Sequence, residues 1–157
     1  MAKIGTEIAP SAVEMIAEGL TQALAETSVE TMKAQNYHWN VEGMGFGPLH
    51  ALFQEMYEDH FEAQDELAER IKSLDVHAEG RQSVYLQRSK IDECDGKVSD
   101  KAMIKALQHD QETLSATLRA LAATADEHGD VVTNDLAIER AQKHDKFAWM
   151  LRAHLKG

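Results

Sequence analysis

The stretch NYHWNVEGMGFGPLH places His38 and His50 on either side of a loop that contains three glycines and a proline. Further along the chain, Asp65 and Glu69 are carboxylates spaced four residues apart. Imidazole together with carboxylates suits Fe(II), Mn(II) or Zn(II). A mixed set of nitrogen and oxygen ligands with open positions favours redox-active iron over structural zinc. These residue types therefore raise the hypothesis of a metal site that performs redox chemistry.

One amphipathic helix over residues 48–74 is predicted to carry most of these residues. Its apolar stripe advances by three or four positions, through Leu49, Leu52, Phe53, Met56, His60, Ala63, Leu67, Ile71 and Leu74. A second face, about 100–200° away from the stripe, carries His50, Gln54, Phe61, Asp65 and Glu69. Along such a helix His50 and Asp65 lie roughly 22 Å apart. One chain therefore cannot bring both to the same ion.

Two antiparallel copies of this helix would remove the difficulty. The pairs His50/Glu69 and Gln54/Asp65 are symmetric about a point between positions 59 and 60. Two-fold contacts pair residues reciprocally in this way. A two-fold axis at that point would bring His50 to the partner's Glu69 and Gln54 to the partner's Asp65, so one dimer would hold two equivalent clusters.

The middle of this face favours a subunit contact, because a bulky Phe61 is unusual on a solvated helix face. His38, at the end of the preceding helix, can fold over the same position through the glycine loop. The predicted site combines His38 and His50 of one chain with the partner's Asp65 and the partner's Glu69. Taken singly, each of these residues also has an ordinary explanation, as a packed ring, a first-turn surface residue or a solvated pair.

The remaining signals predict an all-α chain. Helix formers are abundant, and no stretch alternates apolar and polar residues as a strand does. Four long helices are expected over residues 11–38, 48–74, 101–126 and 131–155, with a short helix near 84–88 in a polar crossover. The pattern indicates one domain, 1–157, that begins with a short tail, 1–10, and forms a four-helix bundle of ferritin-like connectivity.

An intrachain di-iron centre is not expected in this bundle. Such centres use a Glu-x-x-His motif, and none of the eight histidines has a Glu three residues before it. His60 lies on the apolar stripe and is expected to be a core residue with satisfied hydrogen bonds. No partner is predicted for His144.

Charge and cysteine usage limit the partners and the compartment. A net charge of −11 argues against a simple phosphate-binding surface. The single Cys94 cannot form an internal disulfide, which favours a reducing compartment. The sequence contains no long apolar run, and its start lacks the apolar core of a signal peptide. We expect a cytoplasmic protein without a membrane partner.

The motif HWNVEGMGFGPLH, followed by DELAER at 65–70, closely resembles the Dps family of DNA-binding proteins from starved cells, or miniferritins. The resemblance extends over nearly the whole chain, including the long crossover and the segments GDVVTNDL and DKFAWML. It implies a hollow dodecamer, built from two-fold dimers, with iron sites between subunits. Such shells oxidise Fe(II), preferably with hydrogen peroxide and otherwise with oxygen. They store Fe(III) as a mineral and thereby protect DNA in the oxidative stress response.

The resemblance also assigns site residues. It implies that His38 and His50 bind iron from one subunit, and Asp65 and Glu69 from its partner. The position of Gln54 is usually acidic in the family. Because a neutral amide is a poorer iron ligand than a carboxylate, one firm iron site with a weak neighbour is implied. Iron is the implied metal, and no haem is expected.

Other acidic positions match the family's iron-entry pores at three-fold axes. Asp130 and Asp135 are the matching residues, with Asp126 and Glu127 as further candidates. On the sequence alone, Asp130 and Asp135 fit equally well as charges at a helix N-terminus. Trp39 matches a family tryptophan beside the iron centre, where it would trap stray oxidising equivalents or simply pack. A further acidic group would face either the cavity or the solvent: Glu55, Glu58, Asp59 and Glu62.

Two other functions compete with iron oxidation. The family name suggests direct DNA binding and compaction of the nucleoid, often through a Lys-rich tail, but MAKIGTEIAP offers only Lys3. Twelve chains at −11 each give −132 formal charges, which repel a polyanion beyond a Debye length of about 10 Å. We therefore expect weak or no direct DNA binding. The remaining alternative is a helical scaffold without a redox role.

Overall fold

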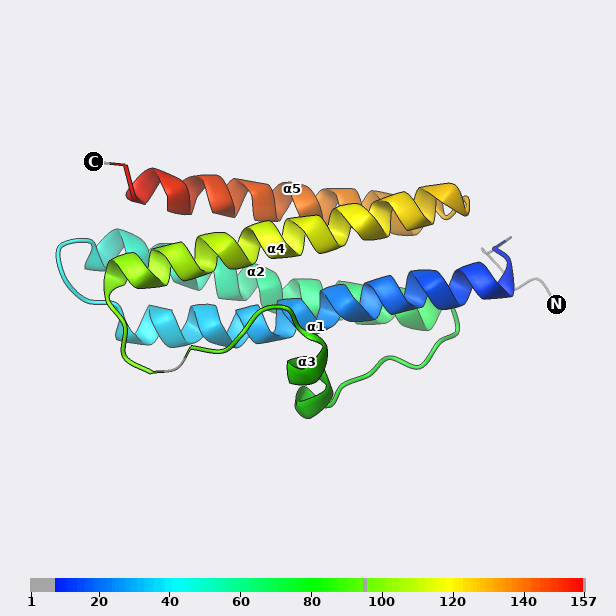
Figure 1. The fold of residues 1–157 in the computed structure, drawn as a ribbon, viewed down its shortest axis with the longest axis horizontal. Coiled ribbons are helices and arrows are strands. Elements are labelled where there is room, and N and C mark those ends of the chain that lie inside the picture. The colour runs from blue at the N-terminus through cyan, green and yellow to red at the C-terminus, as the bar shows by residue number, and fades with distance from the viewer. Residues whose placement is uncertain (1–7, 95, 157) are drawn as a thin grey trace.

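The computed structural model describes residues 8–94 and 96–156 of the chain. Helices dominate this part, and no strand occurs within it. They are α1 (Pro10–Asn40), α2 (Phe46–Ser73), α3 (Gln82–Arg88), α4 (Asp100–Glu127) and α5 (Val131–His154). In Figure 1 the four long helices lie side by side, and the short α3 lies outside them against α1. The predicted all-α class is confirmed.

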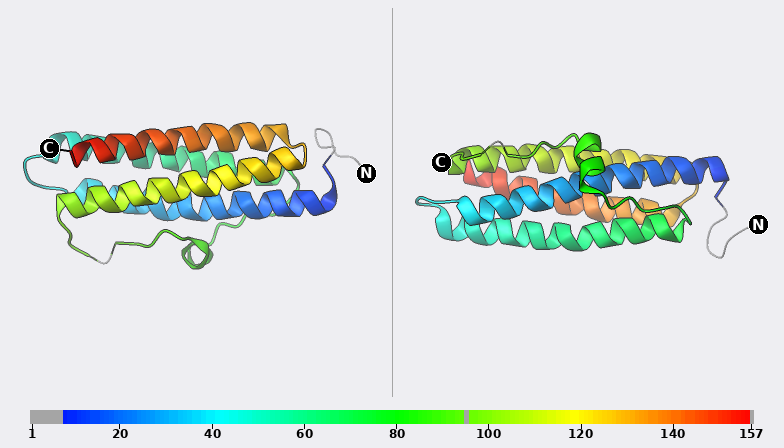
Figure 2. Two further views of the ribbon diagram at one scale, coloured as in Figure 1. Left: turned by 45° about the horizontal axis from the view of Figure 1, so that its top comes forward. Right: turned by 90° about the horizontal axis from the view of Figure 1, so that it is seen from below.

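The connectivity is that of a four-helix bundle with one long crossover. Helices α1 and α2 form one antiparallel pair, and α4 and α5 form the other. Between α2 and α4 the chain runs back along the whole bundle, past α1 (Figure 2). This is the predicted ferritin-like connectivity. Among the described residues, no helix has both the length and the apolar character needed to cross a bilayer.

The helix bounds differ from the predicted ones by one or two residues. The first long helix starts at Pro10, whose missing N–H has no intrahelical partner in that first turn. The second starts at Phe46 rather than Pro48, so Pro48 still lies in a first turn. Within the crossover, α3 is fixed by Tyr85, which is buried and donates to the Glu79 carbonyl. Of the predicted tail, residues 1–7 lie outside the described residues.

The core is apolar at both ends of the bundle and polar in the middle. One apolar cluster contains Leu20 and Ile71, and the other contains Phe53 and Leu107. Full burial of such a side chain contributes about 1.5–3 kcal/mol. A layer of polar side chains separates the two clusters: Glu30, Asp59, His60, Asp110, Gln111, Arg140 and His144.

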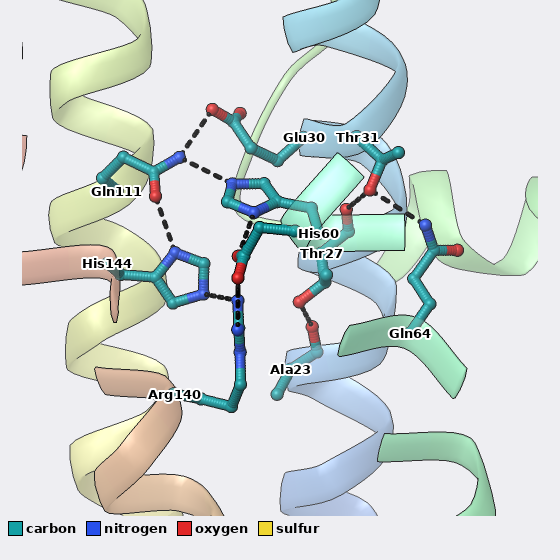
Figure 3. Close-up of polar contacts among 10 residues, drawn as sticks. Ala23, Thr27, Glu30, Thr31, His60, Gln64, Gln111, Arg140 and His144 are labelled. Carbon is teal, nitrogen blue, oxygen red and sulfur yellow. Dashed lines mark hydrogen bonds and ion pairs between the residues drawn. The ribbon is translucent and has the colours of Figure 1, made fainter. Parts of the chain in front are cut away.

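Gln111 is the centre of this polar layer (Figure 3). Its amide nitrogen donates to Glu30 Oε1 at 3.0 Å and lies 3.1 Å from His60 Nε2. Its amide oxygen lies 2.6 Å from His144 Nδ1. An amide N–H can only donate and an amide oxygen can only accept. His60 therefore presents an unprotonated Nε2, and His144 a protonated Nδ1.

Both histidines are completely buried, and burial lowers the pKa of each. The network continues to Asp59, whose Oδ2 accepts from His60 Nδ1 at 3.0 Å and from Arg140 at 2.8 Å. Burial alone would raise the pKa of Asp59, but the hydrogen bonds from His60 and Arg140 outweigh it and hold that pKa below its usual range. The prediction for His60 is confirmed. For His144, for which the sequence predicts no partner, the structure supplies Gln111 from another helix.

Acidification is expected to lower the stability of the folded chain below about pH 6.5. The unfolded chain protonates His60 and His144 at their ordinary pKa, whereas the folded chain resists protonation. Their contribution is therefore complete above the unfolded pKa and is lost as the pH falls through it, by up to about 1.4 kcal/mol per pH unit for each histidine. Urea unfolding between pH 7.5 and 5.5, at one protein concentration, measures this slope.

His144→Gln keeps an amide at this position and should flatten the slope by one histidine's share. His109→Gln, at an exposed position, should leave the slope unchanged. Burial and the neighbouring Asp110 raise the pKa of Glu30, which contributes with the opposite sign. Comparing the variants with the natural chain removes that common contribution. Equal slopes in the natural chain and the His144 variant would contradict the argument.

Candidate metal site

A tight hairpin between α1 and α2 brings His38 and His50 together. His38 lies in the last turn of α1 and His50 in the second turn of α2. Gly43 adopts a φ of 103°, which side-chain-bearing residues rarely adopt, and its carbonyl accepts from Phe46 N at 3.1 Å. The glycine loop thus has a specific structural task, which is to close the hairpin over a short distance.

The two histidines hydrogen-bond each other's backbone. His38 Nδ1 lies 2.7 Å from the His50 carbonyl oxygen, and His50 Nδ1 lies 2.7 Å from the His38 carbonyl oxygen. The second contact satisfies one of the carbonyls that the last turn of a helix leaves without an intrahelical partner. Because a carbonyl can only accept, both Nδ1 atoms carry the proton. In the neutral ring, Nε2 then keeps its lone pair.

The rings are stacked, with centroids 3.7 Å apart and planes inclined by 16°. Phe46 stacks on His50 at 5.0 Å, and Tyr57 meets His38 edge-on at 5.3 Å. Within the described part of the chain, neither Nε2 atom has a hydrogen-bond partner. The pair therefore offers two unprotonated nitrogens in a fixed arrangement, which is the form in which imidazole binds a metal.

Asp65 and Glu69 lie one turn apart further along α2, and both are exposed. Neither carboxylate has a side-chain hydrogen bond or ion pair to any described residue. Phe61, on the same predicted face, is 70% exposed. Within one chain, the described residues bring no three metal-binding side chains together. The structure thus unites the two histidines but leaves the two carboxylates apart from them, and the site between subunits stays a prediction.

The remaining site candidates differ in what they contact. Gln54 is exposed, and its amide nitrogen donates to Glu58 Oε1 at 2.9 Å. Trp39 is 59% exposed, next to His38 in the sequence. Of the acidic group with two possible roles, Asp59 is bound to Arg140 within the bundle, while three members are exposed: Glu55, Glu58 and Glu62.

Asp130 differs from the other pore candidates because it is buried. It is the N-cap of α5 and accepts from Thr133 N at 3.0 Å. It also forms an ion pair with Arg70 at 2.9 Å. Burial raises the pKa of Asp130, but these contacts outweigh it and lower the pKa below its usual value. The other pore candidates are exposed: Asp126, Glu127 and Asp135.

Comparison with known proteins identifies the family to which this bundle belongs. The ferritin-like domain family matches residues 17–157. The bundle is therefore that of a ferritin-like protein. A DNA protection during starvation protein from Helicobacter pylori is 34% identical over 139 residues, 88% of this chain and 96% of that protein. An uncharacterized low-temperature-induced protein from Nostoc sp. is 35% identical over 140 residues, 88% of this chain and 78% of that protein.

A solved structure agrees with these relatives. The crystal structure of a Dps protein from Vibrio cholerae, described as one of the ferritin-like diiron-carboxylate proteins, gives a TM-score of 0.92 at 32% identity. The match covers 99% of this chain and 98% of that one. The chain belongs to the Dps family of ferritin-like proteins, as its histidine motif indicated. Iron storage and protection against oxidative stress are the general functions that this membership supports.

Asp130→Ala is expected to destabilise the chain by about 1–3 kcal/mol, because it removes a helix cap and leaves Arg70 without its carboxylate. Asp135→Ala, at an exposed position of the same helix, should stay within about 0.5 kcal/mol of the natural chain. Thermal and urea unfolding measure both differences. Equal losses in the two variants would contradict the structural role given to Asp130. If the exposed acids line a pore, the Asp135 variant should keep its stability but slow the entry of Fe(II).

Proposed function

We propose that this chain is the subunit of a ferroxidase and iron-storage shell whose iron sites lie between two-fold related copies. The observation that carries the proposal is the stacked His38–His50 pair, with both Nε2 atoms free of partners in the described structure. Asp65 and Glu69 stand exposed on the same predicted face of α2, in the positions that a two-fold axis would bring to this pair.

Each residue has a distinct chemical task in this proposal. The neutral nitrogens of His38 and His50 bind Fe(II) without adding charge. The partner's Asp65 and the partner's Glu69 supply anionic oxygens, which favour Fe(III) more than Fe(II) and so promote loss of an electron. Gln54 can offer only a neutral amide oxygen, so the second iron position is the weaker one.

The proposed oxidant is hydrogen peroxide, with oxygen as the substitute. Two Fe(II) ions, one peroxide and two water molecules give two FeO(OH) units and four protons. Each iron loses one electron. Both electrons reduce the peroxide, so its O–O bond breaks and both oxygen atoms reach the oxidation state they have in water. No hydroxyl radical is released by this two-electron reduction. The stored mineral and the consumed peroxide together account for protection of DNA.

Assembly is part of the proposed function, because one copy holds only half of each site. The exposed Phe61 lies between the histidine end and the carboxylate end of α2, where a symmetric contact would cover it. We propose a dodecamer built from such dimers that acts in the cytoplasm and protects the nucleoid through its chemistry. The reaction needs no membrane and no haem.

Asp65→Ala/Glu69→Ala is expected to abolish rapid iron oxidation. Loss of both carboxylates removes the anionic oxygens from each site and leaves two neutral nitrogens. Anaerobic titration of the apo-protein with Fe(II), followed by one addition of peroxide, measures binding and then oxidation. In the natural chain the iron should oxidise within seconds and stay in a large soluble particle. In the variant it should bind weakly and precipitate.

Glu14→Ala/Glu139→Ala is the matched control, since it removes the same charge from exposed positions on α1 and α5. It should behave like the natural chain. Gel filtration of all three proteins separates loss of the site from loss of assembly. If the site variant oxidises and retains iron as the natural chain does, the site is wrongly assigned. If none of the three retains iron, the scaffold alternative is favoured.

Direct DNA binding is expected to be weak or absent at neutral pH, because twelve chains at −11 each carry −132 formal charges. An electrophoretic mobility assay with linear duplex DNA at physiological salt, with a chelator present to prevent bridging by divalent cations, tests this. The DNA should migrate unchanged at every protein concentration. Retardation that weakens as salt increases would instead support the DNA-binding alternative.

A further inference from the structure

We propose that Phe46 is a positioning residue of the iron site, and that it holds the ring of His50 against His38 so that both Nε2 atoms keep one direction. The inference rests on the proposed function. It is carried by a three-ring stack, in which Phe46 lies 5.0 Å from His50 at 28°, and His50 lies 3.7 Å from His38 at 16°.

Phe46 has no evident role in the core. It is 46% exposed at the first position of α2, and it belongs to neither large apolar cluster. Tyr57, which meets His38 edge-on at 5.3 Å, packs against one of these clusters and therefore has structural duties. Among the described residues, the contact with His50 is thus the one ring contact of Phe46.

The geometry of the two histidines explains why a third ring matters. A single hydrogen bond from Nδ1 acts as a pivot, about which the ring plane can still turn and carry Nε2 with it. His38 is only 8% exposed and is enclosed by its surroundings. His50 is partly exposed, and the rings of His38 and Phe46 both stack against it. Removal of the Phe46 ring therefore frees His50 more than His38.

Pre-organisation of this kind should appear as metal affinity, because a ligand that is already oriented loses less conformational freedom on binding. Aromatic pairs contribute enough to make a change of about 2- to 10-fold in a dissociation constant. The expected defect is therefore a weaker metal site on an intact fold.

The test compares Phe46→Leu, which keeps an apolar side chain but removes the ring, with Phe46→Tyr, which keeps an aromatic ring. The first measurement is independent of metal: crystal structures of both variants as apo-proteins. The Leu variant should show the His50 ring turned or without a single orientation, and the Tyr variant should keep the stack. An unchanged His38–His50 stack in the Leu variant would overturn the proposal.

The second measurement is anaerobic titration of the same apo-proteins with Co(II), followed through its visible absorption bands. Binding should weaken by about 2- to 10-fold in the Leu variant and recover in the Tyr variant. Gel filtration and thermal unfolding should be the same for all three proteins. Loss of assembly in the Leu variant would mean that Phe46 is a subunit contact, which also overturns the proposal.

The two measurements separate this inference from the proposed function. If the natural chain binds no Co(II), or binds it equally after Asp65→Ala/Glu69→Ala, the proposed iron site fails. The apo-structures would then still decide whether Phe46 orients His50. If the natural site binds Co(II) and the Leu variant binds it equally well, the iron site stands and the role of Phe46 is refuted.

Discussion

A polar group that a helical bundle buries needs a partner inside it, since an unsatisfied one costs about 1–3 kcal/mol. The middle of this bundle meets most of that need with a layer contributed by all four long helices, in which Gln111 links Glu30, His60 and His144. Glu30 Oε2 and Arg140 Nε are the atoms of this layer that stay without a hydrogen bond or ion pair among the described residues. Helix α2 contributes His60 to this layer, so its rotation about its own axis is fixed at that level. The opposite face of the same helix, with Asp65 and Glu69, is thereby directed outward.

The same rule operates at the hairpin, with a different outcome. There the unsatisfied group is a backbone carbonyl in the last turn of α1, and His50 Nδ1 satisfies it. His38 makes the reciprocal contact to the first turns of α2. In each histidine, Nδ1 thus stabilises the hairpin and Nε2 has no partner among the described residues. A structural role and a metal-binding role are therefore compatible, because they use different atoms of the same ring.

Much of this arrangement could be predicted from the sequence, because it depends on local periodicity. The apolar stripe of α2 and the turn at Gly43 each follow from a few neighbouring residues. The predicted bounds of α2 were right to within two positions. The network around His144 could not be predicted, because its partner Gln111 lies 33 residues away on another helix. The ion pair of the buried Asp130 could not be predicted either, since its partner Arg70 lies 60 residues away in the sequence. The stacking of Phe46 on His50 follows from the hairpin's closed geometry, which no periodicity encodes.

Four histidines of this chain differ in the one property that decides between structure and chemistry. In His60, Nδ1 is bound to Asp59 and Nε2 to Gln111. In His144, Nδ1 is bound to Gln111, and Nε2 lies 3.3 Å from the cationic Arg140. A cation entering the bundle centre would find no free lone pair on these rings and would meet a guanidinium. His38, in the last turn of α1, and His50, in the second turn of α2, each keep an Nε2 without a hydrogen-bond partner among the described residues. The two histidines of the polar layer are thus committed to the fold, whereas His38 and His50 keep the nitrogens that the proposed metal site requires.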